Sequence, residues 1–311
     1  MPERVPTGSH RSAGSAGAAR RGWLLSMPGL AFLAVFFVLP LLVLLRVSLY
    51  QGGGRSGFGI GGGFYTPGTW SLDAYRGLFE DAYFSDVLRF TIAFGLQAAL
   101  CAVLIGFALA LLISRLQGWK RLLALAAIFL PKLANVLVMV YGLQLLLGDH
   151  GPVNQLLAPL HPGPAPLALL HNYPGALIGE VYLILPYAVL LLVATLDRID
   201  PLLRPAARGL GAGAVRTLVR VTLPLALPGL STTFVLCTVF AFGAFVAPYI
   251  LGSPDQFTLS IDIQRQAFEN SNWPRAAAEA VMMLCALGGM GLLFQSSRRL
   301  TQPIRGDRPV S

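Results

Sequence analysis

The sequence predicts an all-α polytopic membrane protein, and two observations carry this prediction. Of the 311 residues, 55% are hydrophobic and only 12% are charged, which is rare among soluble globular domains. Six apolar segments are each long enough to cross a bilayer, for which a helix needs about 20 residues. They cover residues 23–47, 87–114, 122–147, 174–196, 223–250 and 275–297. Buried helices of a soluble bundle are the alternative, but stretches such as "ALCAVLIGFALALLI" lack the polar face that such helices need.

The N-terminal segment is predicted to be a disordered tail followed by a permanent anchor. Residues 1–22 are rich in Ser, Gly, Ala and Arg, a composition that buries too little apolar surface to offset the entropy of ordering. The apolar run after Arg20 and Arg21 is longer than the roughly 7–15 residues of a signal-peptide core. No small-residue cleavage pattern follows it, so we expect this run to stay as the first transmembrane helix.

The distribution of basic residues predicts the orientation. If both termini are cytoplasmic, the inside segments hold four, three, five and four Lys or Arg residues, sixteen in all. The outside loops hold three, namely Arg55, Arg76 and Arg265. Because cytoplasmic loops carry an excess of Lys and Arg, we expect both termini inside the cell. Arginines that face anionic lipid headgroups also explain the net charge of +9, without a nucleic-acid partner.

Two further features predict local structure outside the cytoplasmic loops. In "SLDAYRGLFEDAYFSDVL", apolar side chains recur at helical spacing beside acidic ones, which predicts a short helix in the outer membrane interface. In the second apolar segment, four small residues recur every four positions, at Ala98, Ala102, Gly106 and Ala110. Such a stripe lets two helix backbones approach closely. The alternative is that small residues are simply common in membrane spans.

The longest inside loop, "IDPLLRPAARGLGAGAVRTLVRVTLPLALPGL" at 199–230, predicts a compact knob under the membrane. Asp200 before Pro201 is a helix-start signal. The glycines that follow, above all Gly211, can form a left-handed turn that ends this helix. A second short helix is expected through "AVRTLVRV", with Leu223-Pro224 leading into the fifth span. A shape of this kind predicts a docking surface.

This loop resembles the "EAA" loop of permease subunits of binding-protein-dependent ABC importers. The resemblance rests on the spacing from Ala206-Ala207 to Gly211 and on to Leu223-Pro224. It implies a type I importer fold in which the loop sits in a groove of an ATP-hydrolysing subunit. The implied ATPase-coupling residues are Pro205, Ala206, Ala207, Arg208, Gly209, Leu210, Gly211, Leu223 and Pro224. Pro205 stands where the family motif has an acid, and a proline inside the expected helix predicts a kink.

The resemblance extends over residues 70–297 and is to the spermidine/putrescine-type subfamily, through stretches such as "LPKLANVLVMVYGLQLLLGDHGPVNQLL" and "FGAFVAPYILGSP". It implies a multi-pass protein of the cytoplasmic (inner) membrane that works with an ATPase dimer, a second permease subunit and an extracytoplasmic solute-binding protein. The chain then divides into a cytoplasmic tail (1–22), a first transmembrane helix with an external loop (23–86), the importer module (87–297) and a second cytoplasmic tail (298–311).

A single lysine within the third apolar segment bears on the solute. Lys132 follows Pro131 at about mid-membrane, where a charge is costly and is either functional or paired. It could attract an anionic group in the pathway, or it could pair with Glu180 or Glu279. The resemblance implies import of a small hydrophilic solute of the polyamine type. Ala244 stands near a position where several polyamine-type relatives have an acid, so this residue and Lys132 weaken the polyamine assignment and leave open an anionic or zwitterionic solute such as a phosphonate. The candidate pathway residues are Lys132, Asn135, Tyr141 and Phe245.

The sequence contains no pattern for catalysis by this chain. It has no GxxxxGK[ST] phosphate loop and no HExxH motif, so we expect no catalytic residue and no cofactor, with ATP and Mg²⁺ bound by the partner ATPase. His150, His161 and His171 lack the close grouping of a zinc site, so no metal site is expected. A secondary transporter driven by an ion gradient is the main rival, but no repeats are visible in the six spans. An intramembrane enzyme is a further alternative, but it would need a catalytic dyad or a set of metal ligands, and neither is visible in the sequence.

Overall fold

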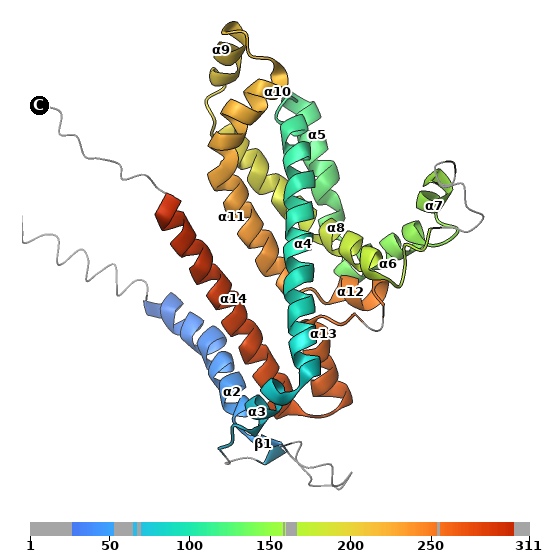
Figure 1. Ribbon diagram of the computed structural model, residues 1–311, viewed down its shortest axis with the longest axis vertical. Coiled ribbons are helices and arrows are strands. Elements are labelled where there is room, and N and C mark those ends of the chain that lie inside the picture. The colour runs from blue at the N-terminus through green and yellow to red at the C-terminus, as the bar shows by residue number, and fades with distance from the viewer. Residues whose placement is uncertain are drawn as a thin grey trace, which may run out of the picture.

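The chain folds into a splayed group of long helices, as a computed structural model shows (Figure 1). The structure describes residues 27–52, 65–66, 70–157, 159, 167–253 and 256–301. Within these residues, six helices are long and apolar enough to cross a membrane. They are Met27–Ser48, Ala82–Ile113, Val136–Leu157, Tyr173–Asp197, Ala214–Phe242 and Trp273–Leu292. The all-α prediction is confirmed; the described strands are a short antiparallel pair, β1 (Gln51–Gly52) and β2 (Tyr65–Thr66).

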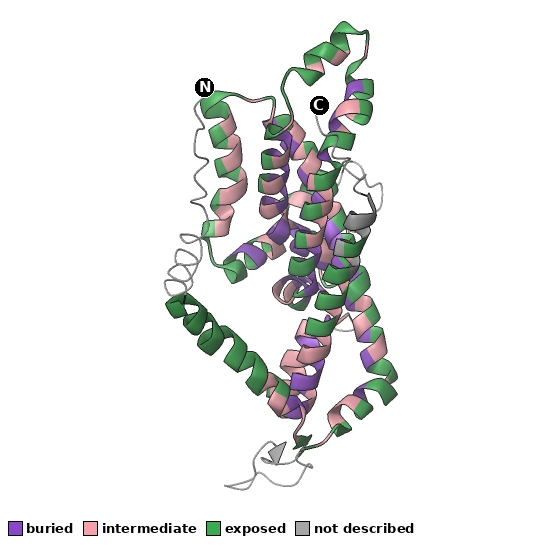
Figure 2. Cartoon of the chain, turned by 90° about the vertical axis from the view of Figure 1, so that its left-hand side faces the viewer, coloured by how far each residue is buried: buried purple, intermediate pink, exposed green. Residues whose placement is uncertain are grey.

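Three helices form the packed centre: α4 (Ala82–Ile113), α8 (Tyr173–Asp197) and α11 (Leu223–Phe242). The small-residue stripe of α4 is buried at all four positions. A Cβ atom on Gly106 would lie only 3.1 Å from the Cβ of Ala188 on α8, so these two helices approach as closely as the stripe allows. The prediction that the stripe marks a packing face is confirmed, and Figure 2 shows the buried positions gathered in these helices.

A second pair of helices diverges from this centre. The first helix contains a π-helical turn, η1 (Ala34–Val38), and continues as α2 (Leu39–Ser48), which packs against α14 (Trp273–Thr301). Its apolar side chains are exposed along most of its length, as Figure 2 shows. The predicted N-terminal tail at 1–22 lies outside the described residues. At the other end of the chain, α14 continues to Thr301, four residues beyond the predicted end of its span at 297.

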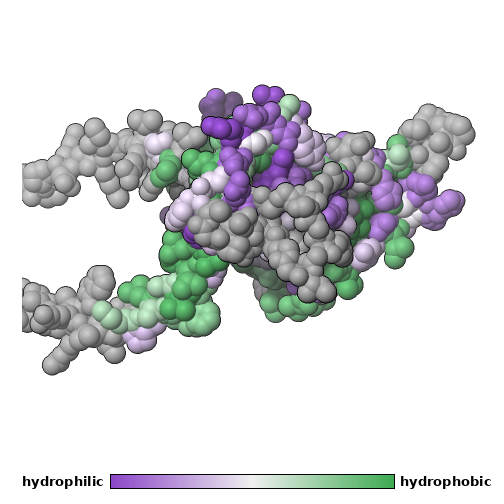
Figure 3. Space-filling model, turned by 90° about the horizontal axis from the view of Figure 1, so that it is seen from below, coloured by the Kyte–Doolittle hydropathy of each residue, from purple (hydrophilic) through white to green (hydrophobic). Residues whose placement is uncertain are grey.

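The predicted interfacial helix is present as α3 (Asp73–Glu80). The next span begins at Ala82 and not at residue 87, because the Asp81 carboxylate accepts a hydrogen bond of 3.0 Å from the Tyr83 N–H and caps α4. Hydrophilic residues gather at this end of the molecule, while hydrophobic residues cover the flanks (Figure 3). This polarity is typical of a helix end that emerges from a bilayer.

The third span was predicted as one continuous segment over 122–147, and this prediction is wrong. Helix α5 (Gly118–Phe129) ends in a 3₁₀ turn, η2 (Leu130–Leu133), and a new helix, α6 (Val136–Leu147), begins after an extended residue at Ala134. A further short helix, α7 (Pro152–Leu157), follows. Pro131 lacks the N–H of a continuous helix, and the Asn135 side chain caps α6 by accepting from the Leu137 N–H at 2.9 Å.

The fifth span also differs from its predicted limits of 223–250. Its helix starts at α10 (Ala214–Thr217), passes through a π-helical turn, η4 (Leu218–Thr222), and continues as α11 to Phe242. It breaks at Gly243 before α12 (Val246–Leu251), and α13 (Leu259–Gln264) and a π-helical turn, η5 (Arg265–Glu269), lead to α14. The wider π turn lies immediately before Leu223-Pro224 and accommodates the proline ring, so the chain does not break there.

Candidate functional site

The loop predicted to lie inside the cell forms a knob at one end of the molecule, at the opposite end from α3 (Figure 1). It consists of α9 (Leu203–Gly209), a glycine turn, and α10 with η4. We call residues 200–222 the knob. Its outer surface combines arginines with exposed apolar side chains, and Leu210 at the tip is 90% exposed. Exposed apolar groups beside arginines are typical of protein–protein contact surfaces.

A Schellman motif ends α9 at the predicted position. Gly211 has a φ of +84°, in the left-handed region. Its N–H donates to the Arg208 carbonyl at 2.9 Å, and the Ala212 N–H donates to the Ala207 carbonyl at 3.0 Å. These two bonds satisfy carbonyls that the end of the helix would leave free. The glycine turn is therefore confirmed, and it fixes the direction in which α10 leaves.

The predicted kink at Pro205 is absent. The Asp200 carboxylate accepts from the Leu202 N–H at 2.9 Å, as its helix-start role requires, but α9 itself begins only at Leu203. Pro205 therefore lies in the first helical turn, where an N–H has no intrahelical partner to lose. The second expected helix is likewise not separate, because α10 runs through η4 into α11 without a break at Leu223-Pro224.

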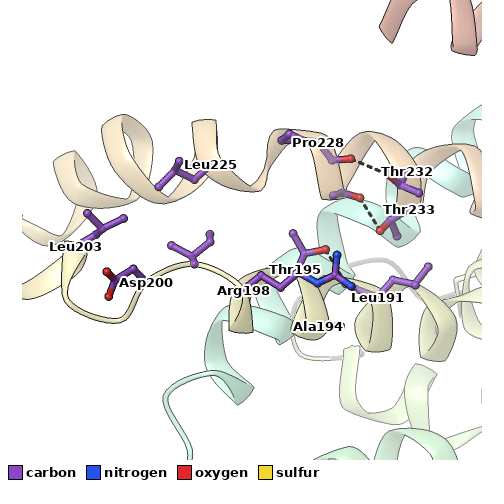
Figure 4. A pocket seen from close by; sticks show the side chains of 12 residues that line it. Leu191, Ala194, Thr195, Arg198, Asp200, Leu203, Leu225, Pro228, Thr232 and Thr233 are labelled. Carbon is purple, nitrogen blue, oxygen red and sulfur yellow. Dashed lines mark hydrogen bonds between the residues drawn. The ribbon is translucent and has the colours of Figure 1, made fainter. Parts of the chain in front are cut away.

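A pocket of about 570 Å³ lies where the knob joins the spans. The end of α8, the start of α9 and the first half of α11 line it (Figure 4). Its walls are mainly apolar, and their polar members are Arg198, Asp200 and three threonines. Thr195 packs against Gly229 so closely that any side chain at position 229 would clash with it. The two spans α8 and α11 are therefore in direct contact where the knob joins them.

Lys132 lies in the 3₁₀ turn at the break between α5 and α6. Its Nζ is 4.9 Å from the ring centroid of Tyr187 on α8. The Tyr187 ring stacks on Phe240 of α11 at 5.1 Å with an interplanar angle of 3°, and Phe129 of α5 meets it edge-on at 6.3 Å. We call Phe129, Tyr187 and Phe240 the aromatic cluster. It gives the lysine a cation–π contact in place of an ion pair.

Of the other candidate pathway residues, Asn135 and Phe245 lie at the two helix breaks and Tyr141 lies within α6. Asn135 is the N-cap of α6, so its side chain has a structural partner. Tyr141 is exposed on α6, and α6 packs against α12. Phe245 is the residue before α12 and stacks on Tyr249 at 5.4 Å. The structure thus places Tyr141 and Phe245 on neighbouring elements and Lys132 beside the aromatic cluster.

Of the two carboxylates considered as partners for Lys132, only Glu180 acts on it. Glu180 is buried on α8 and interacts with Lys132 electrostatically. Glu279 is not a partner, because its carboxylate accepts a hydrogen bond of 3.2 Å from Arg275 on the same helix. Arg275 also forms an ion pair with Asp81, and this hydrogen bond lowers the pKa of Asp81. Arg275 therefore ties α14 to the start of α4.

The aromatic cluster and the Arg275 pair were not anticipated from the sequence. A signal existed for the second, since Arg275 and Glu279 are four residues apart on one helix, a spacing that brings side chains together. No local sequence pattern predicts the aromatic cluster. The three rings come from three segments separated by more than fifty residues each, and they meet only in the packed bundle.

Residues 102–302 match the family of binding-protein-dependent transport system inner membrane components. The chain belongs to this family. It is 28% identical to the spermidine/putrescine transport system permease protein PotB of Escherichia coli (strain K12), over 86% of this chain and 94% of that protein. It is 30% identical to PotB of Haemophilus influenzae (strain ATCC 51907 / DSM 11121 / KW20 / Rd), over 86% of this chain and 90% of that protein. The family assignment makes this chain the membrane permease component of an ABC importer.

A solved structure has the same fold. A chain of a bacterial ABC transporter involved in the import of the acidic polysaccharide alginate superposes with a TM-score of 0.72 at 18% identity. The match covers 92% of this chain and 99% of the other. The type I importer fold predicted from the sequence is therefore confirmed, together with the multi-pass membrane location.

Proposed function

We propose that this permease imports polyamines such as spermidine and putrescine across the cytoplasmic membrane, driven by a partner ATPase. The similarity to PotB over 86% of the chain supports this solute class over an anionic or zwitterionic solute. The observation that carries the coupling to an ATPase is the knob, which protrudes from the bundle with an apolar tip at Leu210. ATP and Mg²⁺ would be bound by that partner.

The coupling residues are Pro205 to Gly211 with Leu223 and Pro224, as the motif implies. Binding of ATP would close the ATPase dimer and move the knob. Since α10 continues into α11 without a break, this movement would tilt the fifth span directly. The pathway would lie between this chain and a second permease subunit, and an extracytoplasmic binding protein would deliver the solute into it. On this chain it would be lined by Lys132, Asn135, Tyr141 and Phe245. Both termini would lie in the cytoplasm, and residues 87–297 would form the importer module.

Reconstitution tests this proposal. The chain is expressed with its gene neighbours, purified through a tag on the chain, and assayed in right-side-out vesicles for uptake of radiolabelled spermidine. We expect an ATPase subunit to co-purify and uptake to require ATP inside the vesicles and the binding protein outside. Uptake that persists without ATP but collapses with an ionophore would show a secondary transporter instead. ATP-driven uptake of another solute, with spermidine ignored, would refute the polyamine assignment alone.

A further inference from the structure

The aromatic cluster has the composition of a site for an organic cation. Tyr187 offers a ring face to the Lys132 ammonium, and Phe240 and Phe129 pack around that ring from two other helices. Aromatic side chains gathered in this way bind ammonium groups through the negative potential of the ring faces. Phe240 is 47% exposed, so the cluster opens to the surface of this chain.

A carboxylate lies on the same face of α8. Glu180 precedes Tyr187 by seven residues, which is two helical turns, and it is 4% exposed. A buried acid and an aromatic ring about 10 Å apart match a chain with two ammonium groups separated by methylenes, since 7 residues at a rise of 1.5 Å span that length.

Lys132 is held by a segment that can release it. The 3₁₀ turn that carries it is followed by the extended residue Ala134, and α6 is capped independently by Asn135. The lysine can therefore swing away without unwinding α6. None of the ion pairs among the described residues includes Lys132, so no salt bridge holds it in place.

We propose that Lys132 is a tethered ammonium that fills a cation site formed by the aromatic cluster and Glu180, and that a cationic solute must displace it. Two ammonium groups repel each other at short range in a site of low polarity, so lysine and solute occupy it alternately. The site is thereby kept filled when no solute is present. This inference rests on the proposed function only for the identity of the transported cation.

The test measures an ammonium probe and not transport. Tetramethylammonium binding to the purified importer complex in nanodiscs, without the binding protein, is followed by saturation-transfer NMR. We expect Lys132→Met to bind the probe about tenfold more tightly than the wild type, because the competing cation is gone. Adding Tyr187→Leu should abolish the gain. Lys120→Met, a change at an exposed lysine of the same α5–α6 segment, should leave the affinity unchanged.

A wild-type measurement covers the case in which the variants fail to assemble. Reductive methylation of Lys132, read by mass spectrometry, should be faster with tetramethylammonium present, because the displaced amine reaches the reagent. Equal or weaker probe binding by Lys132→Met, a gain that survives Tyr187→Leu, or methylation insensitive to the probe would each overturn the proposal. Spermidine uptake by the wild type is scored separately. If the wild type does not take up spermidine but the probe binds as expected, the polyamine assignment is contradicted. If it takes up spermidine but the probe results fail, the tethered-cation site is contradicted.

Discussion

At the scale of single residues, the backbone conformation of the knob depends on one glycine. Gly211 adopts a φ of +84°, whereas Gly213, two positions later, has a φ of −67° that any residue tolerates. An added Cβ meets nothing within 4 Å at either position, so the two sites differ in backbone strain and not in space. The spacing of the motif predicted the turn because only glycine is at ease in the left-handed region. The ring neighbours of Lys132 were not predictable, since Tyr187 and Phe240 come from distant segments.

This difference gives a matched pair of variants. Gly211→Val should cost about 1–2 kcal/mol in the turn, because a β-branched residue is disfavoured in the left-handed region. The strain should displace α10 and uncouple the ATPase, so uptake falls at least tenfold while the protein remains in the membrane. Gly213→Val should transport as the wild type does. The measurements are vesicle uptake and solute-stimulated ATP hydrolysis. Coupled transport by Gly211→Val would contradict the role of this turn.

At the scale of elements, apolar length predicted the number of spans, but not where they break. The breaks depend on competition between local caps and the continuous helix: Asn135 stabilises a new start after Pro131, whereas the π turn before Pro224 removes a break that the proline suggested. A hydropathy profile detects neither the helix cap at Asn135 nor the π turn before Pro224. Face patterns were more informative, because the stripe on α4 depends only on helical periodicity, and the structure buries every member of it.

A pair of identical substitutions on α4 measures this packing face. Ala102 is fully buried at the contact with the other central helices, whereas Ala108 on the same helix is exposed. Ala102→Leu should destabilise the protein by about 1–3 kcal/mol through overpacking. Ala108→Leu should change stability by less than about 0.5 kcal/mol. Thermal unfolding in detergent, followed by cysteine reactivity or light scattering, compares the two. Equal midpoints would contradict close packing of α4 against its neighbours.

At the scale of the whole molecule, the knob and α3 mark opposite ends, and the long helices run between them (Figure 1). The charge asymmetry predicts that the knob lies in the cytoplasm, since the segments expected inside hold sixteen Lys and Arg residues and the loops expected outside hold three. The exposed apolar surface of α2 would face lipid or another subunit in the membrane.

Impermeant thiol labelling tests the orientation. A cysteine at Leu210, 90% exposed at the tip of the knob, should react with a membrane-impermeant maleimide only after the membrane is opened. A cysteine at Phe79, 72% exposed on α3, should react in intact cells. The unsubstituted chain, which contains Cys101, Cys237 and Cys285, supplies the background. Thr217 would be a poor reporter, because only 4% of its surface is exposed. Because positions 210 and 79 lie at opposite ends of the same molecule, their labelling reports on opposite sides of the membrane. Labelling of position 210 in intact cells, with position 79 protected, would show that the topology is the inverse of the predicted one. The knob could then contact no cytoplasmic ATPase.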